Sequence, residues 1–186
     1  DREIAYGNII AVEARGGVTG IAGDGETAVP EPVLVLHGAG TTVAATKDQI
    51  PVTLTGELED DKTRLEAAFA ALHGKPVRAI YIAPAVATDT LSDSDALQSG
   101  VLSLSAFAEA VRAFHNGSEP DTRPRLGLVL PGGAPVAAGK AGNAVNSGLW
   151  TFARVLQNEY DMLDIHCLDV TGDASAGISA ALAALG

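Results

Sequence analysis

The sequence predicts an α/β fold built on a parallel sheet, and two observations lead to this prediction. Short apolar runs rich in Val, Ile and Leu alternate with longer segments whose apolar residues recur every three or four positions. The short runs are typical of strands buried on both faces of a sheet, and the longer segments are typical of amphipathic helices. This alternation of strand and helix predicts parallel strands joined by right-handed crossovers.

The individual elements follow from the same periodicities. Strands are predicted over 33–36, 51–55, 77–83, 125–130 and 165–170. Helices are predicted over 42–49, 63–73, 94–115, 143–160 and 175–185, and residues 37–40 are predicted as a turn. We therefore expect a truncated Rossmann-like parallel sheet with helices on both faces, spanning residues 33–186.

The N-terminal part of the chain differs in composition from this region. Residues 8–14 predict a further short strand, and residues 16–32 are rich in Gly, Pro and acidic side chains, which predicts a connecting loop. Residues 1–32 are thus expected to be an N-terminal strand and loop that precede the Rossmann-like subdomain.

Composition excludes several classes of function. The 186 residues suit one domain, and the net charge of −11 disfavours nucleic-acid and anionic membrane partners. The single cysteine, Cys167, cannot form an internal disulfide and indicates a reducing, cytoplasmic location. No apolar run approaches the roughly 20 residues that span a bilayer.

One local motif resembles a known family. The stretch NSGLWTFARVLQNEY at 146–160 and the strand IHCLDV at 165–170 resemble the first half of ketoreductase regions in type I polyketide synthases. These regions contain two halves similar to short-chain dehydrogenases/reductases. The resemblance implies that the first half, here about 33–170, is a structural subdomain, and that the second half carries the nicotinamide site and catalytic tyrosine.

The resemblance also implies where catalytic residues would lie if this chain had them. It places Gly142 at the position of the catalytic Tyr and Asn146 at the position of the Lys. Residues 131–133, Pro-Gly-Gly, stand where the Ser is expected, and residues 83–86 stand where an Asn-Ala-Gly motif is expected. Glycine cannot protonate an alkoxide, and asparagine cannot supply a cation. We therefore predict no catalytic residue.

The glycine-rich turns give weak evidence for a cofactor. Gly38 and Gly40 fit the start of a dinucleotide loop, but Thr42 and Ala44 occupy the later glycine positions. The glycines of 16–25 are not preceded by a strong strand or followed by a helix, so a flexible connector is expected there. We predict no bound cofactor.

The remaining polar candidates have simple structural interpretations. His37 follows the first buried strand, where α/β ligands usually bind, and is the one histidine with a functional hypothesis. Cys167 is predicted as a core residue. Other candidates are expected to interact with helix ends or lack a metal-site pattern: His73, His115 and His166; Glu57, Glu59, Asp60 and Asp61; Asp89, Asp93 and Asp95. We predict no metal site.

These observations lead to a functional hypothesis with three alternatives. The chain is expected to brace a catalytic ketoreductase half or adjacent synthase domains, through an apolar surface patch. The first alternative is a divergent NADPH-dependent reductase that uses Gly38 and Gly40. The second is the degenerate first half of a long-chain ketoacyl-carrier-protein reductase, and the third is a free-standing interaction module.

Overall fold

A computed structural model describes residues 32–39, 41, 43, 46–83, 93–115, 122–134, 142–169, 178 and 181–182. Strands and helices alternate through this part of the chain, apart from the first two strands. The elements are β1 (Val33–Gly38), β2 (Gln49–Leu54), α1 (Leu58–Ala70), β3 (Arg78–Ile82), α2 (Asp93–Phe114), β4 (Arg125–Val129), α3 (Ala144–Glu159) and β5 (Asp164–Leu168).

The five strands form one sheet in the order β2-β1-β3-β4-β5, and every pair is parallel. Parallel neighbours require crossover connections, and α1, α2 and α3 supply those between β2 and β3, β3 and β4, and β4 and β5. The predicted Rossmann-like α/β fold is therefore confirmed.

The central strands are buried on both faces because their side chains alternate between two apolar cores. Leu34 and Leu36 of β1 belong to the larger core, which lies under the three helices. Val33 and Val35 point to the smaller core on the opposite face. This arrangement explains the uninterrupted apolar run in β1.

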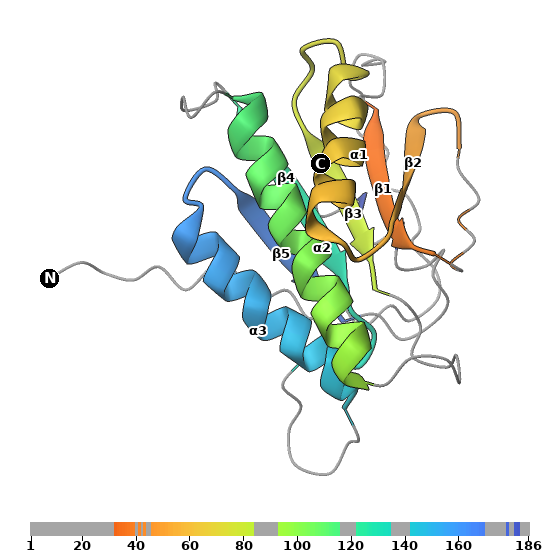
Figure 1. Cartoon of the computed structure of the whole chain (residues 1–186), viewed down its shortest axis with the longest axis vertical. Coiled ribbons are helices and arrows are strands. Elements are labelled where there is room, and N and C mark those ends of the chain that lie inside the picture. Colours follow the sequence, from red (N-terminus) through yellow and green to blue (C-terminus); the bar gives the residue numbers. More distant parts are fainter. Residues whose placement is uncertain are drawn as a thin grey trace, which may run out of the picture.

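The three helices form a layer over one face of the sheet, with α2 between α1 and α3 (Figure 1). Phe69 of α1 packs edge-on against Phe107 of α2 at a centroid distance of 5.8 Å. On the opposite face, helical residues Ile178, Ala181 and Leu182 pack against the smaller core. Helical residues thus contact both faces of the sheet, as predicted.

The structure corrects two local predictions around the end of β1 and the start of β2. The predicted helix over 42–49 is wrong at its described end, because Lys47 and Asp48 form a turn and Gln49 begins β2. Pro51 keeps the preceding residue extended, and the segment gains hydrogen bonds by pairing with β1. His37 and Gly38, predicted in a turn, continue β1 and pair with β2.

Helix α1 begins at Leu58 rather than at residue 63 and ends at Ala70 rather than at 73. His73 has a φ of 51°, a left-handed conformation that cannot continue a helix. The other bounds differ from the predictions by only a few residues. The predicted strand over 8–14 and residues 16–31 of the predicted loop lie outside the described residues, as does most of the predicted helix over 175–185.

Candidate functional site at the carboxyl edge of the sheet

The candidate site lies where the parallel strands end at their carboxyl termini. In open α/β sheets, ligands bind at this edge, near the point where successive connections leave in opposite directions. The order β2-β1-β3 places that point between β1 and β3. His37, Ala83 and the turn Pro131–Ala134 follow or end three neighbouring strands at this edge.

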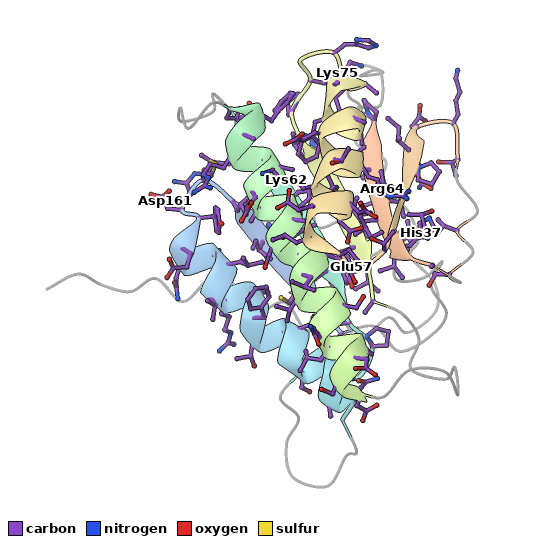
Figure 2. All side chains as sticks on the ribbon, viewed as in Figure 1. His37, Glu57, Lys62, Arg64, Lys75 and Asp161 are labelled. Atoms are coloured by element: carbon purple, nitrogen blue, oxygen red, sulfur yellow. The ribbon has the colours of Figure 1, made fainter. Side chains whose placement is uncertain are left out.

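His37 is held by its neighbours rather than presented to a ligand. Its side chain is 8% exposed, and Figure 2 places it at the same end of the sheet as Glu57. His37 Nδ1 lies 3.2 Å from the Gly38 carbonyl oxygen, and Nε2 lies 3.5 Å from Thr53 Oγ1. A neutral imidazole protonated on Nδ1 satisfies both contacts, donating to Gly38 and accepting from Thr53. These two contacts give His37 a structural role at the end of β1. A functional role for His37 stays a prediction.

The described residues leave open space beside Gly38. Among them, outside its chain neighbours, no atom would lie within 4 Å of a Cβ atom at this position. The described backbone closes the turn with a hydrogen bond of 3.2 Å from Thr41 N to the Gly38 carbonyl oxygen. Gly40 and Thr42, the other positions of the candidate dinucleotide loop, lie outside the described residues.

This open space leads to a first prediction. The substitution Gly38→Ala should leave the free energy of unfolding unchanged or raise it by up to about 1 kcal/mol, because alanine restricts the unfolded chain without a clash in the folded state. Urea unfolding followed by circular dichroism measures this change. A loss of more than about 1 kcal/mol would show that the strand cannot accept a side chain here.

The turn between β4 and α3 is fixed by Asp169, the residue that follows β5. The Asp169 carboxylate accepts hydrogen bonds from Gly132 N at 2.7 Å and from Ala134 N at 3.3 Å. Gly132 has a φ of 68°, which a side chain disfavours, and its carbonyl oxygen accepts a bond from Asn143 N at 2.8 Å. The end of β4 is therefore tied both to β5 and to the start of α3.

Asn146 completes this arrangement from the first turn of α3. It is 2% exposed, and its amide Nδ2 donates a 2.8 Å hydrogen bond to the Pro131 carbonyl oxygen. Its backbone N–H donates to the side chain of Asn143, the N-cap residue of α3, at 3.0 Å. We call Pro131–Ala134, Asn143, Asn146 and Asp169 the β4–α3 lock.

The β4–α3 lock brings together two of the positions that the resemblance assigns to catalysis. Asn146, at the position expected for Lys, bonds directly to Pro131, at the start of the segment expected to hold Ser. Gly142, at the position expected for Tyr, is exposed and offers no side chain. Residues 84–86 of the fourth expected position lie outside the described residues. The described groups are neutral amides and a carboxylate already bonded to backbone N–H groups.

A polar cleft of about 280 Å³ opens at the same edge, beyond the end of β2. It lies between the turn after β2 and the first turns of α2, and its lining residues are Thr55, Gly56, Glu57, Asp95, Gln98, Ser99 and Leu102. The charged lining residues are both acidic. This lining disfavours a phosphate group at the end of β2, where dinucleotide-binding sheets hold the ribose.

Below this cleft, Asp61 is a fully buried carboxylate with four hydrogen bonds. Its oxygens accept from Thr55 N at 2.6 Å, Thr55 Oγ1 at 2.9 Å, Gly56 N at 3.0 Å and Ser103 Oγ at 2.7 Å. Burial, assisted by the nearby Asp61 carboxylate, raises the pKa of the Tyr81 phenol well above its usual value. Through its hydrogen bonds to Thr55, Gly56 and Ser103, Asp61 ties the turn after β2 to the middle of α2.

Sequence reasoning grouped Asp61 with acidic residues that complement the positive end of a helix. Glu59 and Asp60 do lie exposed in the first turn of α1, but Asp61 points into the core. The sequence carried a signal for this, because Asp61 lies four residues before Leu65, which places both on the buried face of the helix. The role of Asp169 was also missed, since its partners lie 37 and 35 residues away.

The remaining candidates do not gather into a reactive site. Burial raises the pKa of Cys167 to about 12, with a smaller opposing effect from Arg154, so the thiol is protonated at neutral pH. His166 Nε2 lies 3.2 Å from the Asp164 carboxylate on β5. Within the described residues, no three His, Cys, Asp or Glu side chains are placed to hold a metal ion.

Comparisons with known proteins give no assignment. No model of a known protein family matches the sequence, and no curated protein shows significant similarity to it. In the part of the chain that the structure describes, no helix has the length and apolarity needed to cross a membrane.

Proposed function

We propose that this chain is a non-catalytic structural subdomain of a type I polyketide synthase ketoreductase region, in which it braces a catalytic half or adjacent synthase domains. The observation that carries this proposal is the hydrogen bond between Asn146 and Pro131. Two positions that would act on a substrate in a short-chain reductase are here bonded to each other. Their side-chain and backbone groups stabilise the turn instead.

The chemistry of ketone reduction supports the same proposal. A reductase of this class needs an acid that protonates the developing alkoxide and a cation that lowers the pKa of that acid. Gly142 has no ionisable group, and the amide of Asn146 carries no charge. Asp169 does not replace the missing acid, because both oxygens of its side chain accept hydrogen bonds from backbone N–H groups of the turn.

Electrostatics also opposes binding of the ribose 2′-phosphate of NADPH at the end of β2. NADPH carries several phosphate groups, whereas the charged residues that line this cleft, Glu57 and Asp95, are both acidic. The whole chain has a net charge of −11, so long-range attraction does not compensate. We therefore expect weak or absent binding of the phosphorylated cofactor.

The described surface shows what kind of contact a partner would make. Among the described residues, Val155 of α3 is the exposed large apolar side chain, with 47% of its surface accessible. The extended apolar patch expected from the sequence is therefore not found on the described helix layer. A partner that contacts the described part of this layer meets few exposed large apolar side chains.

The test of this proposal is a titration of the chain with NADPH, followed by nicotinamide fluorescence and calorimetry. We expect no saturable binding up to millimolar cofactor. In parallel, the chain should be co-expressed with the catalytic half of a type I ketoreductase region, and we expect the two to co-elute in size-exclusion chromatography. Saturable micromolar binding of NADPH would contradict the proposal.

The open space beside Gly38 favours one second candidate, a divergent NADPH-dependent reductase. In such a protein the first glycine of the loop permits the tight turn that follows the strand and leads to the pyrophosphate site. If the titration shows binding, Gly38→Ala provides the matched variant, because it fills this space without an expected loss of stability. Binding lost in Gly38→Ala would assign the cofactor to this turn.

A further inference from the structure

The outer edge of β5 carries backbone groups that can pair with another strand. Asp164 N donates to Pro124 O, and Leu168 O accepts from Leu130 N, each at 2.9 Å. In a parallel ladder, alternate residues of a strand bond to the same neighbour. Asp164, His166 and Leu168 therefore face β4, whereas Ile165 and Cys167 direct their N–H and C=O groups to the outer side, where the described residues provide no partner.

The opposite edge of the sheet, at β2, is less suited to such pairing. Asp48 O accepts a bond from Val33 N of β1, so by the same alternation the outward residues of β2 are Gln49, Pro51 and Thr53. Gln49 N already donates to Thr46 O, and Pro51 has no N–H. Proline is a common device that protects an edge strand from further pairing. Within the described sheet, β5 is thus the edge better suited to accept a strand.

We propose that residues 8–14 of this chain pair with the outer edge of β5 as an antiparallel strand. This segment, Asn-Ile-Ile-Ala-Val-Glu-Ala, is rich in β-forming residues and lies outside the described residues. This proposal does not depend on the proposed function. It turns a five-stranded parallel sheet into a six-stranded mixed sheet, a common arrangement in which an edge strand is antiparallel.

The length of the connecting chain permits this pairing. Three strand spacings of roughly 4.8 Å, or about 14 Å in all, separate β5 from β1. Residues 15–32 lead from the segment to Val33 and, at up to roughly 3.3 Å per residue, reach well beyond that distance. If residues 8–14 run antiparallel to β5, they end at the amino edge of the sheet, where β1 begins. The connection through residues 15–32 is then shorter than it would be for a parallel strand.

The choice of occupant also follows from charge and connectivity. A second copy of the chain would bring another net charge of −11 to the same edge, which opposes association. The tethered segment instead has a high effective concentration at β5. In an antiparallel pair, Ile165 and Cys167 would each exchange two hydrogen bonds with residues that lie two apart in 8–14.

Amide hydrogen exchange of the full chain, measured by NMR, tests this proposal. The Ile165 and Cys167 amides should exchange on the order of 100-fold more slowly than in the variant Ile10→Pro/Ala11→Pro, since one of these two adjacent prolines removes a donor directed at β5 in either register. The variant Thr19→Pro is the matched control and should retain the protection. The Asp164 and His166 amides, which bond to β4, should stay protected in all three and report that the sheet is folded.

A second measurement uses the unmodified chain alone. We expect cross-strand nuclear Overhauser effects between the amides of Ile165 or Cys167 and residues within 8–14. Rapid exchange of Ile165 and Cys167 beside protected Asp164 and His166 overturns the proposal. Protection that survives in the double-proline variant, or that increases with protein concentration, also overturns it, because the occupant would then be another segment or a second copy.

Discussion

Replacing Asp61 by alanine should lower the free energy of unfolding by about 3–5 kcal/mol, because two backbone N–H groups lose their acceptor at roughly 1–3 kcal/mol each and α2 loses its tie to the turn. These donors are Thr55 N and Gly56 N, and the tie is the bond from Ser103 Oγ. Alanine also leaves an unfilled space in a buried site. Urea unfolding, followed by circular dichroism, measures the loss.

The neighbouring carboxylate provides the matched control. Asp60 lies in the same helical turn but is exposed, so Asp60→Ala should cost less than about 1 kcal/mol, the usual size of a helix-dipole interaction. A double-mutant cycle of Asp61→Ala with Ser103→Ala should show coupling, because the two side chains bond at 2.7 Å. Equal effects of Asp60→Ala and Asp61→Ala would refute the assigned role of the buried carboxylate.

The fold was predictable because the strongest elements are encoded locally. Helix α3 was predicted over 143–160 and is observed at Ala144–Glu159, since its apolar period and the capping residue Asn143 agree. The segment 42–49 failed for the opposite reason. Its weak helical pattern competes with strand pairing to β1, and Pro51 restricts the residue before it to an extended conformation.

The site was only partly predictable, because its contacts join residues far apart in the sequence. The absence of a Tyr and a Lys at positions 142 and 146 was visible from the resemblance alone. The contacts of Asn146 with Pro131 and of Asp169 with Gly132 could not be predicted in this way. They depend on how β4, β5 and α3 are positioned in the folded chain. The buried face of α1 pointed to Asp61, but nothing in the sequence pointed to its partner Ser103.

The β4–α3 lock has a second consequence, which concerns Gly133. A Cβ atom at this position would lie 2.9 Å from the Leu130 carbonyl oxygen and 3.0 Å from the Asn146 carbonyl oxygen. Both atoms belong to the backbone and cannot rotate away, so the turn and the start of α3 must move apart. We expect Gly133→Ala to lower the free energy of unfolding by about 2–3 kcal/mol, in the upper range for overpacking of a buried site.

Gly38→Ala is the matched control for this loss, because it adds the same methyl group at the same edge of the sheet without a steric contact to the described residues. The two variants should therefore differ in urea midpoint with little difference in the slope of the unfolding transition. Similar stabilities for both would mean that the lock is loose enough to admit a side chain. In that case the bond between Asn146 and Pro131 would not hold the end of β4 rigidly against α3, and the structural role proposed for these positions would lose its basis.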